Sequence, residues 1–485
     1  MDKQIRVIAR LDVKSENVIK GVNFEGLRVI GSPKDLALKY AAQGADELLY
    51  IDTVASLYGR NNLAHILKDM SKAINIPITA GGGITSLDDI DKLLRAGADK
   101  VAINTFLVKN PSFIVEAVEK YGAQCIVASI ALKKSKNGTW SVWTDNAREA
   151  TNIDALEWIL KVQKSGVGEI LLTSIDNDGT IKGLDFELIS TMSEHIKVPL
   201  IVGGGFNLSD IDKINNNWSF DAVAIGSLLH YKKYTIQEIK SELLKSNFQT
   251  RTIGMANISS DLNCHHKKVS IIDYGVGNIF GLTQSLEKIG AKVSLIKTPS
   301  EIEESEKIIL PGVGSFPSAM KALNKLKLVD PIRKFAISGK PLMGICLGAQ
   351  ILLDKGYEGI ECDGLSLIPG EVKLIENDEV KIPHIGWSTL QKEIGFEDHF
   401  ISNLAHGEVV YFVHSYEMRA KQNNVILKVN YGNKKIIAGI VKNNILGLQF
   451  HPEKSGMIGL KILTNFLESL TYEPHLKTLQ SNSSK

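Results

Sequence analysis

The chain has 485 residues, of which 44% are hydrophobic and 23% charged, with a formal net charge of +2. This composition is typical of a globular protein of two or three domains, and the balanced charge argues against binding to nucleic acid or an acidic membrane surface. There is no apolar run of membrane-spanning length and no signal-peptide pattern. The four cysteines are irregularly spaced, so we expect neither disulfide bonds nor a metal site formed by them, and a cytoplasmic location. We also expect no cofactor.

The amino-terminal half contains an internal repeat. The segments IPITAGGGI (76–84) and VPLIVGGGF (198–206) lie 122 residues apart, and so do KVAIN (100–104) and AVAIG (222–226). In each copy, β-rich runs alternate with amphipathic helical patterns. Two such halves over about 250 residues predict a (β/α)₈ barrel. The alternative is an open doubly wound sheet, but no dinucleotide-binding fingerprint follows the first predicted strand.

Glycine-rich turns follow two of the predicted strands. Residues 81–83 and 203–205 are each three consecutive glycines, and they come after the third and seventh strands. One such turn would be a weak signal, because tight turns need glycine anyway. Two at matched places predict two phosphate sites at the carboxyl-terminal end of the barrel, where backbone N–H groups can bind anions. We therefore expect a substrate with two phosphates, bound by Lys20, Gly82, Gly83, Asn104, Asp176, Gly204, Gly205, Gly226 and Ser227.

Three aspartates end predicted barrel strands. Asp12 ends the first strand, and Asp52 and Asp176 end the second and sixth. Taken singly, each is as readily a helix-capping carboxylate as a catalytic one. We favour Asp12 as the acid or base, because the glycine-containing loop that follows it, residues 14–34, carries Lys20 and could close over a substrate. The repeat partner of Asp12 is Ala131, in VASIALK.

Four charged residues, Arg6, Glu47, Lys100 and Glu169, begin predicted strands and so share the opposite end of the barrel. For an arbitrary barrel they would be a plain salt-bridge plug. In this chain a second, functional role is also possible, because the last predicted helix of the barrel ends at this side and the linker begins there. The linker that follows can span at most roughly 60 Å, so the next domain is tethered nearby.

A polar, aperiodic stretch separates the two halves. We predict the barrel over residues 1–250, a linker over 251–267, a second α/β domain over 268–472 and a disordered polar tail over 473–485.

In the second half, KPLMGICLGAQ (340–350) places Cys346 between two glycines, where an apolar strand meets a helix. Such an elbow exposes a nucleophile at the top of a sheet, and the next backbone N–H can stabilise an oxyanion. A lone cysteine is usually a small buried hydrophobe. However, QFHPE (449–453) offers a base, His451, and an orienting carboxylate, Glu453. Together the three side chains predict a nucleophilic triad.

Six motifs of this half resemble the class I glutamine amidotransferase family: IDYGVGN, LPGVGSF, GICLGAQ, HIGW, YFVHSY and QFHPE. They are most similar to the glutaminase subunit of imidazole glycerol phosphate synthase. The barrel half resembles the cyclase subunit of the same enzyme, through RLDVK, VIKGVNF, GGGI, GADKVAIN and SIDNDGT.

The resemblance implies a role for each matching residue. Cys346 would be the nucleophile, His451 the base and Glu453 its orienting partner; Gly312, Gly314 and the Leu347 N–H would stabilise the oxyanion, and Gln350 would line the glutamine site. Ammonia would enter the barrel through the ring of Arg6, Glu47, Lys100 and Glu169. It would then attack a bis-phosphorylated ribotide, in a histidine-biosynthesis reaction that joins the two domains of one chain.

The sequence departs from the family pattern at Ala131, where a second catalytic aspartate is expected, at Arg10, where a small residue is usual, and in the second phosphate turn, where glycine replaces serine. Three interpretations follow. The chain is a true synthase; or it supplies ammonia for amidine formation on a bacterial surface sugar, with a separate ligase-like partner; or it is a non-catalytic scaffold. The intact Cys346, His451 and Glu453 argue against the third.

Overall fold

The computed structural model describes residues 4–55, 64–214, 219–251, 264, 266–275, 277–393, 400–401, 404 and 407–470. The chain forms two compact units. The first comprises Met1–Met255 with Asn377–Trp387, and the second comprises Ala256–Glu376 with Ser388–Lys485. The first unit therefore includes a short segment from the range predicted for the second domain. The predicted tail over 473–485 lies outside the described residues, and so does most of the predicted linker over 251–267.

The first unit is a closed barrel of eight parallel strands, which confirms the fold class predicted from the repeat. Barrel strands that are consecutive along the chain are neighbours, and the pairing of β12 with β1 closes the barrel. β1 is buried along all but its last residue, as expected for a parallel strand covered on both faces. The barrel strands are β1 (Arg6–Lys14), β4 (Glu47–Asp52), β5 (Ile78–Gly81), β6 (Lys100–Ile103), β7 (Ile126–Lys134), β10 (Glu169–Ser174), β11 (Leu200–Gly203) and β12 (Ala222–Ile225).

A β-hairpin extends each of the two repeat-related strands β1 and β7. β1 continues into β2 (Asn17–Val22) and β3 (Glu25–Gly31), and β7 continues into β8 (Trp140–Thr144) and β9 (Glu149–Asp154). The second hairpin thus reproduces the first in the duplicated half of the barrel.

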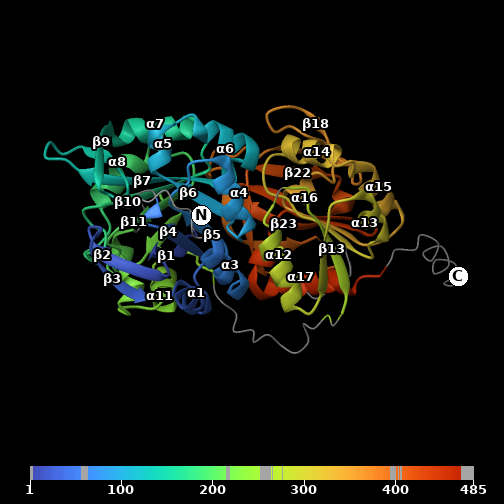
Figure 1. Ribbon diagram of the computed structural model, residues 1–485, viewed down its shortest axis with the longest axis horizontal. Helices are drawn as coiled ribbons and strands as arrows, with labels where there is room; N and C mark the ends of the chain where they lie inside the picture. Colours follow the sequence, from blue (N-terminus) through green and yellow to red (C-terminus); the bar gives the residue numbers. More distant parts are fainter. Residues whose placement is uncertain are drawn as a thin grey trace. The chain divides into compact units, whose positions relative to one another are not determined.

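Amphipathic helices cover the outside of the barrel (Figure 1). In α4 (Leu87–Arg95), the Ser86 side chain caps the first turn, and Ile90, Leu93 and Leu94 form the buried face at helical spacing. The other helices of this unit are α1 (Pro33–Ala42), α3 (Ala64–Ala73), α5 (Thr105–Lys109), α6 (Phe113–Tyr121), η1 (Ala123–Cys125), α7 (Ala155–Lys164), α8 (Phe186–Ser193), α9 (Asp210–Lys213), α10 (Ser227–His230) and α11 (Ile236–Lys245).

The second unit is built on a nine-stranded sheet in the order β14-β13-β15-β16-β25-β24-β23-β20-β21. The first five strands are mutually parallel, and β25, β24, β23 and β20 pair antiparallel. The strands are β13 (Lys268–Ile272), β14 (Lys292–Ile296), β15 (Ile308–Leu310), β16 (Leu342–Ile345), β20 (His384–Lys392), β21 (Val409–His414), β23 (Val425–Tyr431), β24 (Lys434–Lys442) and β25 (Ile445–Leu448).

A smaller sheet and a set of helices complete this unit. The small sheet contains β17 (Lys355–Gly356), β18 (Cys362–Asp363), β19 (Gly370–Leu374) and β22 (Tyr416–Ala420); the helices are α12 (Ile279–Lys288), α13 (Pro299–Glu304), α14 (Phe316–Lys325), α15 (Val329–Ile337), α16 (Leu347–Gln350), η2 (Gln422–Asn424), η3 (Pro452–Lys454) and α17 (Gly456–Glu468).

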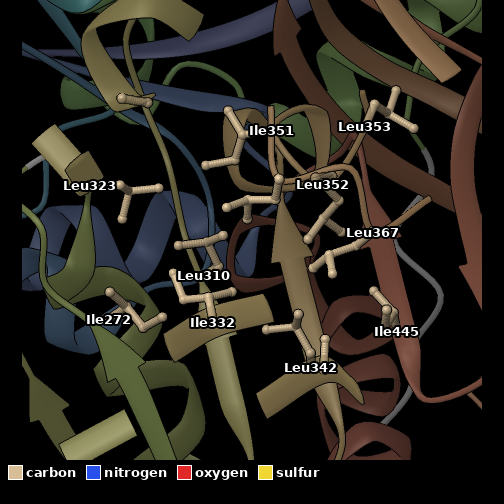
Figure 2. Close-up of a cluster of buried hydrophobic side chains, with 14 of the residues drawn as sticks. Ile272, Leu310, Leu323, Ile332, Leu342, Ile351, Leu352, Leu353, Leu367 and Ile445 are labelled. Atoms are coloured by element: carbon tan, nitrogen blue, oxygen red, sulfur yellow. The ribbon is translucent and has the colours of Figure 1, made fainter. Parts of the chain in front are cut away.

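The core of the second unit packs around the parallel strands. Figure 2 shows Leu310 and Leu342, from β15 and β16, among the leucines and isoleucines that follow α16. This core therefore supports the strand-to-helix turn at Cys346. None of the helices described in either unit is both long and apolar enough to cross a membrane.

Candidate active sites

Cys346 occupies a strained turn between β16 and α16. Its φ is +54° and its ψ is −112°, a backbone conformation that residues with a Cβ rarely adopt. Its N–H donates to the carbonyl oxygen of Leu448 on the neighbouring strand β25, at 2.7 Å. The thiol is therefore placed at the carboxyl end of a parallel strand, as in a nucleophile elbow.

Glycines on both sides of Cys346 allow very close backbone contacts. A Cβ on Gly348 would lie 1.8 Å from the carbonyl oxygen of Leu310, so no side chain is tolerated there. The loop after β15 approaches the same turn, since a Cβ on Gly312 would lie 2.8 Å from the Gly348 nitrogen and from the Leu347 Cβ. Gly314, in this loop, has a φ of +119°, which favours glycine. The structure thus brings Gly312 and Leu347 together beside the cysteine.

His451 and Glu453 follow β25, the strand that pairs with the cysteine strand. The distance between His451 Nδ1 and Glu453 Oε1 is 2.8 Å, and both side chains are buried. Burial lowers the pKa of His451, but the charges of Glu453 and Cys346 outweigh it and hold that pKa well above its ordinary value. Burial raises the pKa of Glu453, but His451 outweighs this effect and the net shift is downward. The arrangement therefore favours an imidazolium beside the thiol.

Two glutamine amides connect the cysteine to the small sheet. Gln449 Nε2 lies 3.7 Å from Cys346 Sγ, and its Oε1 accepts a hydrogen bond from Gln350 Nε2 at 3.0 Å. Gln350 also donates to the Tyr416 carbonyl oxygen, at 2.9 Å. Gln350 was predicted from the sequence to line this site, whereas Gln449 was not.

Glu358 is a further candidate that the sequence analysis missed. Its Oε2 accepts the N–H of Phe316, at the start of α14, at 2.7 Å. Burial raises the pKa of Glu358 to about 7; burial, and to a smaller extent the charge of Glu358, raises the pKa of Tyr416. The carboxylate is therefore near the strand on which Gln350 is anchored. No motif marks the segment YEGIE, and only the fold brings it here.

The mouth of the barrel holds two cavities, one at each glycine-rich turn. The larger, about 940 Å³ including the part open to solvent, is lined by Gly82, Gly83, Asn104 and Arg10. The smaller is about 290 Å³ on the same measure. Its lining includes Lys20, Gly204, Gly205, Gly226 and Ser227. All four of the lining turn glycines have positive φ, and a Cβ on Gly205 would lie 2.5 Å from the Gly183 carbonyl oxygen. The positive φ angles therefore favour glycine at all four positions, and at Gly205 there is also no space for a side chain.

Asp12 lies in a buried cluster of four charges. Its two carboxylate oxygens bind Arg10 Nε at 2.8 Å and Lys20 Nζ at 3.0 Å. Lys20 also binds Asp178 at 2.7 Å. Burial raises the pKa of Asp12, but Arg10 and Lys20 outweigh it and hold that pKa far below its ordinary value. Asp12 is therefore a persistent carboxylate and a poor proton donor.

The other predicted mouth residues are more scattered. Asp176 accepts the backbone N–H of Lys134 at 2.9 Å and lines neither cavity, and Asp178 takes its place beside Lys20. Asp52 caps the turn after β4 by accepting the N–H groups of Val54 and Ala55, which matches the capping alternative. Among the described residues, no group of three or more His, Cys, Asp or Glu side chains is arranged to bind a metal ion.

Arg6, Glu47, Lys100 and Glu169 form a closed ring of ion pairs at the amino-terminal end of the strands. Arg6 binds Glu47 and Glu169 at 2.6 Å each, and Lys100 binds the same two carboxylates at 2.8 and 2.6 Å. All four side chains are buried, and each carboxylate oxygen of Glu47 and Glu169 pairs with one of the two cations of the ring. The barrel strands also carry a buried apolar cluster, which consists of Ile8, Leu49, Ala102, Val127, Leu171, Ile201, Ala222 and Ala224.

The segment Asn377–Trp387 belongs to the barrel unit and packs near this ring. Trp387 donates from Nε1 to the Asp46 carbonyl oxygen at 3.2 Å, and the Arg251 guanidinium lies 4.0 Å from the centre of its ring. A Cβ on Gly386 would lie 3.6 Å from Cδ of Arg6. The HIGW motif thus contacts the amino-terminal end of the barrel.

The chain is similar to known proteins over both units. A family described as "Histidine biosynthesis protein" matches residues 6–235, and one described as "Glutamine amidotransferase class-I" matches residues 270–470. The imidazole glycerol phosphate synthase subunit HisF of Legionella pneumophila is 56% identical over 201 residues, which are 41% of this chain and 95% of that protein. The HisF subunit of Prochlorococcus marinus strain NATL1A is 44% identical over 252 residues, covering 51% of this chain and 98% of that protein.

Proposed function

Because the chain belongs to the family of imidazole glycerol phosphate synthase HisF subunits and continues into a class I glutamine amidotransferase domain, we propose that it hydrolyses glutamine at Cys346 and passes the ammonia to an acceptor bound in the barrel. It is an enzyme of the glutamine amidotransferase and cyclase type. The observation that carries the proposal is the strained Cys346 turn beside the His451–Glu453 pair.

The glutaminase step follows from this geometry. The Cys346 thiolate attacks the side-chain amide carbon of glutamine, and the Leu347 N–H with the Gly312–Gly314 loop stabilises the oxyanion. His451 transfers its proton to the leaving nitrogen, so that ammonia departs and a glutamyl thioester remains. Water, deprotonated by His451, hydrolyses the thioester to glutamate. Glu453 orients the imidazole and stabilises its charged form.

Three groups are suited to hold the glutamine substrate. Gln350 is anchored beside Cys346, and Glu358 is a carboxylate near the same strand. A carboxylate at that position suits the α-ammonium group of an amino acid. Gln449 places an amide N–H near the thiol and can polarise the reacting group.

Ammonia released into bulk water at neutral pH would be protonated and lose its nucleophilicity. We therefore assign the ion-pair ring of Arg6, Glu47, Lys100 and Glu169 as the gate through which ammonia enters the barrel. The first candidate acceptor is the bis-phosphorylated ribotide of histidine biosynthesis, with its phosphates at the two glycine-rich turns. In this reaction Asp12 acts as the base, and ring closure yields imidazole glycerol phosphate.

A specific observation favours a second acceptor. Ala131 stands where the repeat would provide a second carboxylate, and Arg10 and Lys20 hold Asp12 as an anion. Ring closure needs proton transfers that each contribute about 10²–10⁴-fold, and a methyl group contributes none. The second candidate is accordingly a paralogous role, the supply of ammonia for amidine formation on a bacterial surface sugar with a separate ligase-like partner.

Complementation separates the two acceptors. The full chain is expressed in a histidine auxotroph that lacks both synthase subunits, and its Cys346→Ala variant serves as the matched control. Growth that depends on Cys346 supports the synthase. Absence of growth, with glutamine hydrolysis measured in the purified chain, supports the second acceptor. A chain that hydrolyses no glutamine contradicts the proposal for both.

A further inference from the structure

The two halves of the repeat differ in the residues that face the barrel mouth. β1 carries Arg10 and Asp12 at the positions where β7 carries Ser129 and Ala131. Arg10, Ser129 and Ala131 all line the larger cavity. One wall of this cavity therefore carries a cation, and the repeat-related wall carries two small side chains.

Arg10 is buried but only partly engaged. It is 6% exposed, donates from Nε to Asp12 at 2.8 Å, and donates from Nη1 to the Thr173 hydroxyl at 3.3 Å. A guanidinium has five N–H donors. Within the part of the chain that the structure describes, Nη2 makes no hydrogen bond, and Arg10 lines both cavities of the mouth.

We propose that Arg10 binds a carboxylate of the ammonia acceptor, in the space left open by Ser129 and Ala131. This inference rests on the proposed function, because the acceptor is the molecule that receives the ammonia. The inference assigns Arg10 as a specificity-determining residue. It requires the acceptor to carry an acidic group in addition to the phosphates placed at the glycine-rich turns.

The chemistry of the wall suits a carboxylate. A guanidinium binds planar oxyanions through paired N–H groups, which a lysine ammonium cannot do. Thr173 accepts a hydrogen bond from Arg10, so its own hydroxyl proton can point to the ligand, and the Ser129 hydroxyl lines the same cavity. Thr173 and Ser129 therefore add two hydroxyl groups to the cavity that Arg10 lines.

Charge-assisted hydrogen bonds from the guanidinium, rather than the net charge of the whole cluster, would provide the selectivity. Arg10 and Lys20 are balanced by Asp12 and Asp178, so the cluster is close to neutral. Asp12 accepts from Nε and Thr173 from Nη1, so the N–H groups of Nη2 are the donors of Arg10 that can bind a ligand. A neutral carboxamide at the same place would accept these hydrogen bonds but would lack the charge that strengthens them.

The test is calorimetric titration of the full chain with malonate, in buffer containing enough inorganic phosphate to saturate the glycine-rich turns. We expect Arg10→Gln to weaken malonate binding at least tenfold. Lys109→Gln, which removes an exposed cation of the same cavity, should change it less than twofold. Ala131→Val keeps Arg10 but fills the space, and we also expect at least a tenfold loss. Thermal denaturation establishes that each variant is folded.

Three outcomes would overturn the inference. These are undetectable malonate binding to the unmodified chain, equal binding by the Arg10→Gln variant, and equal losses in the Arg10→Gln and Lys109→Gln variants. Glutamate release from glutamine is assayed in parallel. If it is intact while malonate binding fails, only the carboxylate site is wrong; if it is absent while Arg10-dependent binding persists, the proposed function is wrong instead.

Discussion

Oε1 of Glu453 lies 2.8 Å from Nδ1 of His451, two residues earlier in the chain, and both side chains are buried. The carboxylate contributes to holding the pKa of His451 well above its ordinary value, against the effect of burial. The raised pKa keeps the imidazole protonated to higher pH, and a protonated imidazole is the form that can donate a proton to the leaving nitrogen.

Glu453→Gln should therefore lower the pKa of His451 and shift the alkaline limb of the glutaminase pH profile to lower pH. We also expect kcat/KM to fall by about 10²–10⁴-fold, the usual contribution of an acid–base group. The measurement is glutamate release across pH. The exposed Glu361→Gln serves as the control, and an unshifted alkaline limb in Glu453→Gln would contradict the assignment.

Cys346→Ala should abolish glutamine-dependent turnover, because no other nucleophile is placed in the strained turn. Any reaction of the barrel with added ammonium salts should remain. Glutamate release and product formation are measured on the same sample. Loss of both activities in a folded variant would argue against the division of labour between the two units.

If the unmodified chain forms imidazole glycerol phosphate, Asp12→Asn should remove that product. The amide cannot accept a proton, and it binds Arg10 and Lys20 less strongly than the carboxylate does. Product formation from the ribotide and ammonium is the readout, with glutamate release showing whether the loss is confined to the barrel. An unchanged cyclase rate would exclude Asp12 as the base.

Lys100→Met should destabilise the barrel by about 3–5 kcal/mol, because it removes one of the two ring cations that pair with the buried carboxylates of Glu47 and Glu169. Urea unfolding measures the change. The surface pair of Lys92 and Asp88 provides the control, and Lys92→Met should leave the unfolding curve nearly unchanged. Equal effects of the two substitutions would mean that the ring does not contribute as a closed network.

Gly205→Ala should weaken the binding of inorganic phosphate at the second glycine-rich turn. Its φ is +82°, and an added Cβ would lie 2.5 Å from the Gly183 carbonyl oxygen, so the turn must move. Gly138→Ala is a matched control, since Gly138 has a φ of +87° and nothing within 4 Å of the added Cβ. Calorimetric titration measures the affinity of each variant for inorganic phosphate. A lower affinity in Gly205→Ala than in Gly138→Ala would mean that the loss of space, rather than backbone strain, weakens binding. Equal affinities would exclude a turn that fits closely around the phosphate.

The sequence by itself determined the barrel, through paired segments 122 residues apart, and the candidate nucleophile, through Cys346 between two glycines. Such features are local or periodic, because a turn with positive φ needs glycine and a buried parallel strand needs a run of apolar residues. His451 and Glu453 could also be paired in advance, since they are two residues apart.

Only the tertiary structure decided which groups surround each charge. Asp178, rather than Asp176, meets Lys20, and Glu358 reaches the start of α14 although no motif marks it. Arg10 was visible as an unusual residue, but its buried pairing with Asp12 and its place in the same cavity as Ala131 depend on closure of the barrel. The physical reason is that burial and ion pairing depend on distances between strands far apart in the chain, which spacing along the sequence does not specify.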